Sequence, residues 1–259
     1  MLDTIQYLLG AGSGVLVGFV LGLVGGGGSI LAVPLMVYLV GVPSPHVAIG
    51  TSALAVAVNA LTGLVNHIRQ GNVKWRCTLV FAAAGVAGAF GGSSVGKAFD
   101  GQRMLFLFAI VMVVVGVVML LNRKREGDPS VVLGRDNAPK LVGYGLGTGL
   151  FSGFFGIGGG FLIVPGLMGA TGMPMIKAVG SSLVAVTAFG LATAANYAFS
   201  GLVDWGLAAA FIIGGVVGGF LGARLATRLS GNGDRLTSIF AGLIFIVAAY
   251  MLWKSSISL

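Results

Sequence analysis

Long apolar segments alternate with short polar ones along the whole chain. Five apolar segments precede a polar stretch at Asn122–Lys140, and five follow it. A helix needs about 20 apolar residues to cross a bilayer, so the third, fourth and fifth segments of each half are long enough to span one. The second segment of each half is much shorter, which is typical of a half-helix or a re-entrant segment. The segments cover residues 3–24, 29–41, 46–68, 76–96, 103–121, 141–155, 160–172, 176–199, 205–227 and 236–253.

Composition supports a membrane protein. Hydrophobic residues make up 56% of the 259 residues and charged residues only 8%, whereas soluble domains carry about 25% charged residues. Glycine is also abundant, with 46 residues. The glycines have no strict period of three, so collagen is excluded, and their apolar neighbours exclude a flexible linker. An all-α polytopic membrane protein with closely packed or broken helices fits both features.

The two halves are copies of one another. Matched glycines alone could arise from biased composition, but proline, asparagine and tryptophan also recur in the same order. Gly25, Gly28, Pro34, Asn66 and Trp75 recur as Gly156, Gly159, Pro165, Asn196 and Trp205. We therefore expect an N-terminal repeat over residues 1–121, a cytoplasmic linker over 122–140 and a C-terminal repeat over 141–259.

Loop charges indicate how the two repeats are oriented. In the first half the basic residues Arg69, Lys74 and Arg76 follow the third segment, whereas in the second half the basic loop, Arg224–Arg235, follows the fourth. Because basic loops face the cytoplasm, both loops and the linker are placed inside and both termini in the periplasm. This shift favours inverted repeats, which are typical of secondary transporters. A parallel repeat with four spans in each half stays open.

Two glycine-rich loops are candidates for a binding site, since each separates an apolar segment from a short one. Glycine lets backbone N–H groups line a concave surface, and the helix that follows points its positive dipole end at the loop. Inverted symmetry would bring the two loops together in one anion pocket near the midplane. The alternative is that the glycines only allow helices to pack closely. The loop residues assigned to substrate binding are Gly25, Gly26, Gly27, Gly28, Ser29, Gly156, Gly158, Gly159 and Gly160.

Polar side chains on the third segments could complete this site. Their hydroxyls and amides can donate hydrogen bonds to an anion, although membrane serines and threonines also bond to carbonyls of their own helix. The residues assigned to substrate binding here are Thr51, Ser52, Asn66, Ser181, Ser182 and Asn196.

Among the differences between the halves, three polar positions of the third segment are where function could break the symmetry. Asn59, His67 and Arg69 correspond to Phe189, Tyr197 and Phe199. We expect His67 to carry a coupling proton and Arg69 to gather anions at the cytoplasmic mouth. The alternative is that both are ordinary interface residues at a helix end.

The acidic residues disfavour a cation carrier. All seven lie at the termini, in loops or in the linker, whereas cation and proton pumps need a carboxylate within the membrane. An anion carrier fits, because an intramembrane carboxylate would repel its substrate. We expect no catalytic residues, no metal and no cofactor, since the chain has two histidines far apart and one cysteine, Cys77. The expected partners are a small anion and membrane lipid, not nucleic acid, and a homodimer stays open.

At the repeated motifs the chain resembles the TauE/SafE family of sulfite and organosulfonate exporters. The residues that carry the resemblance are Gly25–Gly28 with Val33-Pro34, Gly156–Gly160 with Val164-Pro165, Gly50-Thr51-Ser52 with Gly180-Ser181-Ser182, and Gly71–Trp75 with Gly201–Trp205. The first loop departs slightly, with Gly26 and Ser29 where the second has Ile157 and Gly160. The resemblance implies a bacterial inner-membrane permease that exports sulfite, sulfoacetate or a related sulfonate by alternating access. An anion channel is the main alternative; a membrane-embedded enzyme or an assembly factor fits less well.

Overall fold

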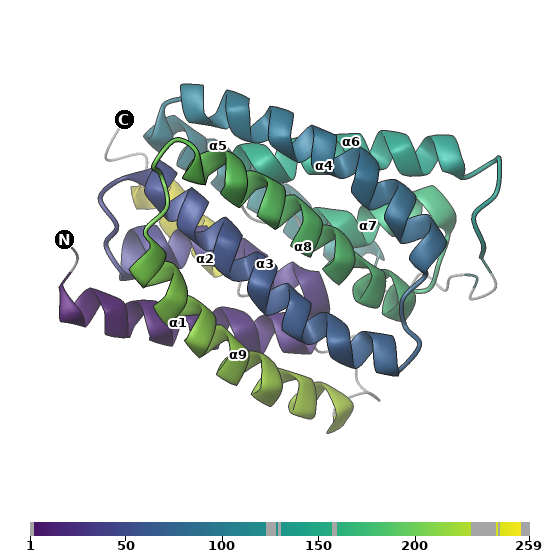
Figure 1. The fold of residues 1–259 in the computed structure, drawn as a ribbon, viewed down its shortest axis with the longest axis horizontal. Helices are drawn as coiled ribbons and strands as arrows, with labels where there is room; N and C mark the ends of the chain where they lie inside the picture. Colours follow the sequence, from purple (N-terminus) through teal and green to yellow (C-terminus); the bar gives the residue numbers. More distant parts are fainter. Residues whose placement is uncertain are drawn as a thin grey trace.

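The computed structural model describes residues 3–122, 128, 131–156, 160–228, 242 and 244–254. Within these residues every regular element is helical, and the helices form one bundle (Figure 1). In chain order they are α1 (Thr4–Val24), the 3-10 helix η1 (Gly25–Leu31), α2 (Ala32–Pro34), the π-helix η2 (Leu35–Leu39), α3 (Pro45–Arg69), α4 (Trp75–Ala98), α5 (Gly101–Asn122), α6 (Ala138–Phe155), α7 (Gly160–Thr171), α8 (Met175–Ala198) and α9 (Trp205–Arg228). A short apolar helix, Ile244–Lys254, follows.

Among the described residues, six helices are long and apolar enough to cross a membrane. They lie in α1, α3, α4, α5, α8 and α9, and the elements that follow α1 and α6 are shorter. Large apolar side chains on the outside of the bundle, such as Leu79, Ile213 and Phe220, are exposed. An apolar exterior is favourable in lipid and costly in water. The expected all-α polytopic membrane fold is therefore confirmed, and the protein crosses the membrane several times.

The first helix of each half packs along the fourth helix of the other half. In α1, a Cβ added to Gly18 would overlap the backbone of Gly215 in α9. In α6, a Cβ added to Gly149 would overlap the backbone of Gly85 in α4 in the same way. In both pairs, glycines at a spacing of four let the two backbones touch. Each half therefore packs its first helix against the other half, so the two halves are interlocked rather than side by side.

The third helices of the two halves, α3 and α8, lie next to each other in the centre. Gly50 near the start of α3 lies beside Tyr197 near the end of α8, and Gly190 lies beside Ala53 and Ala57. The two helices are thus antiparallel, as Figure 1 also shows. Because α3 and α8 are copies of one another in the sequence, equivalent helices of the two halves run in opposite directions, which an inverted repeat requires.

The structure corrects one detail of the first glycine loop. Gly25–Gly28 were expected to form an irregular loop, but they belong to the 3-10 helix η1, which continues directly from α1. A Cβ on Gly28 would overlap the backbone of Leu21 in α1, so η1 folds tightly against the preceding helix. Tertiary packing of this kind overrides the low helix propensity of glycine. In the second half, α6 ends instead at Phe155, and its C-cap residue, Gly156, has a positive φ of 67°.

The predicted linker is bounded by helices that extend slightly into it. Asn122 is the last residue of α5, and α6 already begins at Ala138. Of the residues between them, 123–127, 129 and 130 lie outside the described part of the chain. The division into two repeats and a cytoplasmic linker stays a prediction.

Candidate functional site

The two glycine segments touch in the middle of the bundle. A Cβ added to Gly26 of η1 would lie 2.9 Å from the Cα atom of Gly160, the first residue of α7, and 2.9 Å from Ser182 Oγ. A Cβ added to Gly160 would overlap the backbone carbonyl of Gly26. Only glycine therefore fits at either position without a shift of the other backbone. We call Gly26 and Gly160 the glycine pair.

The two predicted serines lie against the glycine segments of the opposite halves. Ser52 of α3 has its Oγ atom 3.5 Å from the carbonyl oxygen of Gly156, and Ser182 of α8 lies beside Gly26. Both side chains are fully buried. Each hydroxyl also donates to a carbonyl of its own helix, Ser52 to Ile49 at 3.0 Å and Ser182 to Val179 at 2.8 Å. A hydroxyl must rotate away from this carbonyl before it can donate to a ligand.

Backbone donors accompany the glycine pair. Because α7 begins at Gly160, the first N–H groups of α7 have no acceptor within their own helix and carry its positive dipole end. On the η1 side, Gly27 and Ser29 are buried, and Ser29 Oγ donates to the Gly26 carbonyl at 2.9 Å. Gly25 also lies in η1. Gly158 and Gly159, which were assigned to the same site, lie outside the described residues.

Thr51 and Ser181 are placed differently from the serines that follow them. The Thr51 hydroxyl accepts a hydrogen bond from the Asp204 backbone N–H at 3.0 Å, and the Ser181 hydroxyl accepts one from the Lys74 N–H at 2.9 Å. Asp204 and Lys74 immediately precede α9 and α4. Each of these two hydroxyls therefore fixes the start of a helix in the opposite half.

Asn196 belongs to a polar cluster at the far end of α8. Its Nδ2 atom donates to Ser93 Oγ at 2.7 Å and to Ser94 Oγ at 2.9 Å, and its Oδ1 atom accepts from Lys97 Nζ at 2.8 Å. Lys97 Nζ also donates to Ser200 Oγ at 2.8 Å. Lys97 was not among the residues predicted from the sequence. The sequence did offer one indication of its role: Lys97 lies one turn after Ser93 and Ser94, near the end of α4.

Asn66, His67 and Arg69 lie at the other end of the bundle. Asn66 and His67 are half-buried and Arg69 is exposed. Asn66 is two heptads from Ser52 on the same helix, which corresponds to about 20 Å along its axis. The glycine pair lies beside Ser182, and Leu183, the next residue, lies beside Gly63 of α3. The pair is therefore nearer to this end of α3 than to Ser52, although among the described residues no side-chain hydrogen bond joins Asn66, His67 or Arg69 to it. The start of α8 lies at this same end of α3. There the Lys177 ammonium donates to the Gly71 carbonyl at 2.9 Å.

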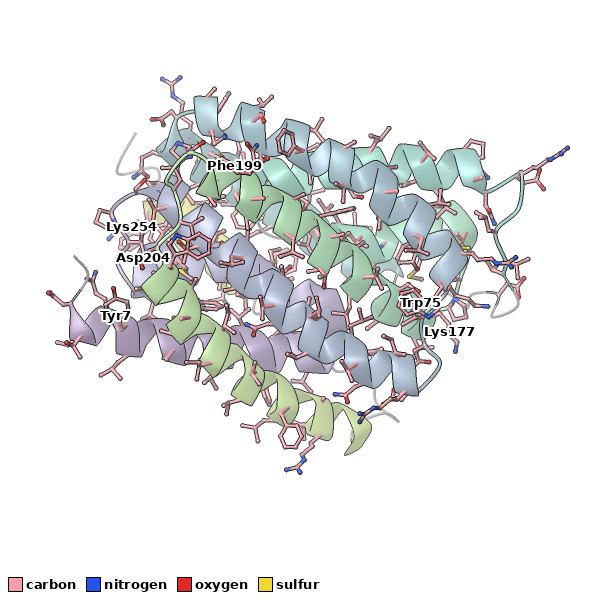
Figure 2. The ribbon with its side chains drawn as sticks, in the orientation of Figure 1. Tyr7, Trp75, Lys177, Phe199, Asp204 and Lys254 are labelled. Atoms are coloured by element: carbon pink, nitrogen blue, oxygen red, sulfur yellow. The ribbon has the colours of Figure 1, made fainter. Side chains whose placement is uncertain are left out.

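Charge is segregated to the two ends of the protein. Every described carboxylate (Asp3, Asp100, Asp128, Asp136 and Asp204) lies outside α1–α9. Figure 2 shows Lys177 and Trp75 at one end and Tyr7, Asp204, Phe199 and Lys254 at the other. Among the described residues, no group of three or more His, Cys, Asp or Glu side chains could hold a metal ion. The glycine pair is thus surrounded by neutral groups.

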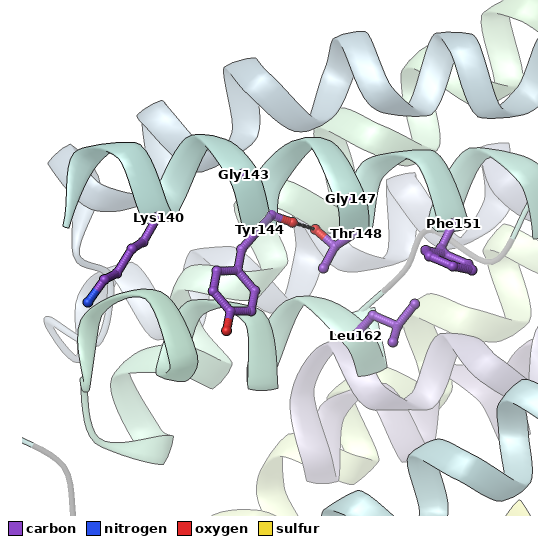
Figure 3. Close-up of a pocket in the computed structure, with 7 residues that line it drawn as sticks. All are labelled: Lys140, Gly143, Tyr144, Gly147, Thr148, Phe151 and Leu162. Atoms are coloured by element: carbon purple, nitrogen blue, oxygen red, sulfur yellow. Dashed lines mark hydrogen bonds between the residues drawn. The ribbon is translucent and has the colours of Figure 1, made fainter.

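A separate groove of about 530 Å³ lies between α6 and α7 (Figure 3). Its walls are mostly apolar, and the Thr148 hydroxyl in it already donates to the Tyr144 carbonyl at 2.7 Å. Tyr144 and Phe151 are about half exposed on the outside of the bundle. This groove lies on the outside of the bundle, whereas the glycine pair lies in the core between the two halves, so the glycine pair is the better candidate site. The lining residues are Lys140, Gly143, Tyr144, Gly147, Thr148, Phe151 and Leu162.

Comparison with known proteins identifies the family. The family model described as sulfite exporter TauE/SafE matches residues 10–251. The chain is 53% identical over 260 residues to a probable membrane transporter protein of Xylella fastidiosa, with 99% of each chain covered. It is 26% identical over 242 residues to the probable membrane transporter protein YdhB of Bacillus subtilis, which covers 89% of this chain and 96% of the relative. No solved structure matches the chain. The match extends over nearly the whole bundle, including both members of the glycine pair, and the protein belongs to the TauE/SafE family of membrane transporters.

Proposed function

We propose that the protein exports a small sulfur-containing anion, such as sulfite, sulfoacetate or a related sulfonate, through the bacterial inner membrane. The observation that carries this proposal is the contact between Gly26 and Gly160, two glycines of opposite halves that meet beside Ser182 in the core. The family description supplies the chemical class of the substrate. The anion binds at this contact, and the two halves move around it by alternating access.

Neutral donors suit this substrate. Moving an anion out of water is costly unless fixed dipoles replace its hydration shell. The first N–H groups of α7 provide such dipoles, and the Ser52 and Ser182 hydroxyls can turn from their own carbonyls toward the anion. The described carboxylates all lie outside the helices, so none of them repels the substrate at this depth.

The distribution of basic residues supports the orientation. Most of the described basic residues gather at one end of the bundle. They are Arg69 at the end of α3, Arg224 near the end of α9, Lys74 just before α4, Lys140 near the start of α6 and Lys177 near the start of α8. This end faces the cytoplasm by the positive-inside rule, together with the linker. The opposite end combines Asp3, Asp100 and Asp204 with fewer basic residues and faces the periplasm with both termini. The antiparallel α3 and α8 support inverted halves.

Transport by purified protein in liposomes tests the proposal. Sulfite, sulfoacetate, taurine, thiosulfate and sulfate are compared at rising concentrations, with empty liposomes as the control. We expect saturable flux of at least one of the first four anions. Flux that never saturates would identify a channel, and chemical conversion of the anion would identify an enzyme. No flux with any of them would contradict transport of this class and favour an assembly factor.

A further inference from the structure

A ladder of polar residues runs along one face of α3. Ser52, Asn59 and Asn66 are seven residues apart, and seven residues make almost two full turns, so the three side chains share one face. The ladder runs from the second-half glycine segment, next to Ser52, to the half-buried Asn66 near the basic end. Asn59 lies in the middle, about 10 Å from Ser52 along the helix axis.

Asn59 is buried without a hydrogen-bond partner. Its side chain is only 2% exposed, and neither Nδ2 nor Oδ1 has a partner among the described residues. The amide lies directly over Gly215 of α9, where a Cβ would overlap it. Gly215 in turn touches Gly18 of α1. A buried amide normally has its hydrogen bonds satisfied, so the unpaired Nδ2 and Oδ1 atoms of Asn59 require an explanation.

The second half lacks this middle polar residue. Phe189 occupies the equivalent position of α8 between Ser182 and Asn196, packs against Gly85 and stacks on Phe81 with ring centroids 6.1 Å apart. The apolar ring fills the space that the Asn59 amide occupies in the first half. The polar ladder is therefore continuous only on α3.

The chemistry of an amide specifies what can satisfy Asn59. The side chain presents a donor, Nδ2–H, next to an acceptor, Oδ1. A fully deprotonated oxyanion offers only acceptors, so it can accept from Nδ2 but leaves the buried Oδ1 without a partner. An oxyanion that carries one proton offers both, because its O–H can donate to Oδ1 while a charged oxygen accepts from Nδ2. Asn59 therefore favours a protonated oxyanion over an unprotonated one.

We propose that Asn59 determines specificity for oxyanions that carry one proton, which pass along the Ser52–Asn66 ladder through the core. This inference rests on the proposed function, because it assigns the protonation state of the same substrate. The binding step makes and breaks hydrogen bonds only. Sulfite, which takes up a proton near neutral pH, belongs to the favoured class. Methanesulfonate, which stays deprotonated, does not.

The titratable groups of the protein would act on both anions alike. Those on the helices around Asn59 lie toward the helix ends, and His67, eight residues along α3, is the nearest in sequence on that helix. They are Tyr7 on α1, His46, His67 and Arg69 on α3, Lys177 and Tyr197 on α8, and Arg224 and Arg228 on α9. A proton carried by His67 would change sulfite and methanesulfonate flux together, so the ratio of the two fluxes isolates the protonation of the anion.

The test measures sulfite and methanesulfonate flux into proteoliposomes from mildly alkaline to mildly acidic pH. Wild-type protein should prefer sulfite increasingly as the pH falls. Asn59→Leu, which keeps the size of the side chain, should lower this ratio about tenfold or more. Asn59→Asp should regain the preference only at acidic pH, where a protonated carboxyl again pairs a donor with an acceptor. Thr193→Val, which removes another buried hydroxyl without a partner, should keep the wild-type ratio.

A ratio that Asn59→Leu leaves unchanged, with both anions still transported, would overturn the inference and leave the proposed function standing. The inference also fails if Thr193→Val lowers the ratio as much as Asn59→Leu, because the effect would then be structural. If wild-type protein transports neither these anions nor the other sulfur anions, the proposed function itself fails.

Discussion

The ammonium of Lys97, at the end of α4, donates hydrogen bonds to both oxygen atoms of Asn196, at the end of α8. The distances are 3.0 Å to the main-chain carbonyl oxygen and 2.8 Å to Oδ1. Asn196 completes the link by donating to Ser93 and to the serine that follows it on α4. The positions equivalent to Asn196 and Ser93 are Asn66 on α3 and Ala223 on α9, which cannot form the same cluster, because alanine has no hydroxyl. The link between third and fourth helices is therefore built differently at the two ends.

Replacing Lys97 with methionine should destabilise the protein. The substitution removes three donated hydrogen bonds from a charged group, each typically contributing about 1.5–3 kcal/mol, and leaves Asn196 Oδ1 without this partner. We expect a loss of about 2 kcal/mol in all, because water reaches the half-buried site and replaces part of the bonding. Thermal unfolding of the purified protein measures this. Arg103→Met, at an exposed position of the same end, is the control, and equal unfolding temperatures for the two variants would contradict the prediction.

Adding one methyl group at Gly18 should weaken the contact between α1 and α9. The new Cβ would overlap the Gly215 backbone, and overpacking of this kind costs about 1–3 kcal/mol. Gly149→Ala should cost a similar amount, because it disturbs the equivalent contact of α6 with α4. Gly12→Ala on α1 meets nothing within 4 Å and should be neutral or slightly stabilising. Unfolding temperatures in one detergent compare the three, and a Gly18→Ala variant as stable as Gly12→Ala would exclude this contact.

Cysteine labelling should place Arg69 and Phe199 on opposite sides of the membrane. These residues occupy equivalent positions in the two repeats and are both exposed, at the ends of the antiparallel α3 and α8. In a Cys77→Ala background, a membrane-impermeant maleimide applied to intact cells should label Phe199→Cys but not Arg69→Cys. Lysis should expose Arg69→Cys. Labelling of both positions from the same side would indicate a parallel repeat and contradict the orientation proposed above.

The duplication made much of the arrangement predictable. Matched residues such as Pro34 and Pro165 define the repeat. Short apolar helices are confirmed in both halves, as α7 in the second and as η1–η2 in the first, where the helix already includes the glycines. The shift of the basic loop already favoured opposite directions for the two halves. These features are encoded locally, by segment length, loop charge and the order of residues in the sequence.

The pairing of helices between halves could not be predicted. Glycines every four residues, such as Gly14, Gly18 and Gly22, indicate close packing but do not specify the partner helix. The same limit applies to the site. The roles of Thr51 and Ser181 at the starts of α9 and α4 depend on loops far away in the sequence. The contact between Lys97 and Asn196 joins residues 99 positions apart, and nothing in either segment alone indicates it.

The central claim is that the Gly26–Gly160 contact forms the anion site. Calorimetric titration of purified protein with sulfite tests it most directly, using wild-type protein, Gly160→Ala and Gly147→Ala. A methyl group at Gly160 would overlap the Gly26 carbonyl, whereas one at Gly147 meets nothing within 4 Å. We predict that Gly160→Ala weakens sulfite binding about tenfold or more, about 1.4 kcal/mol, while Gly147→Ala binds like wild type. Wild-type affinity in a folded Gly160→Ala protein would contradict the claim.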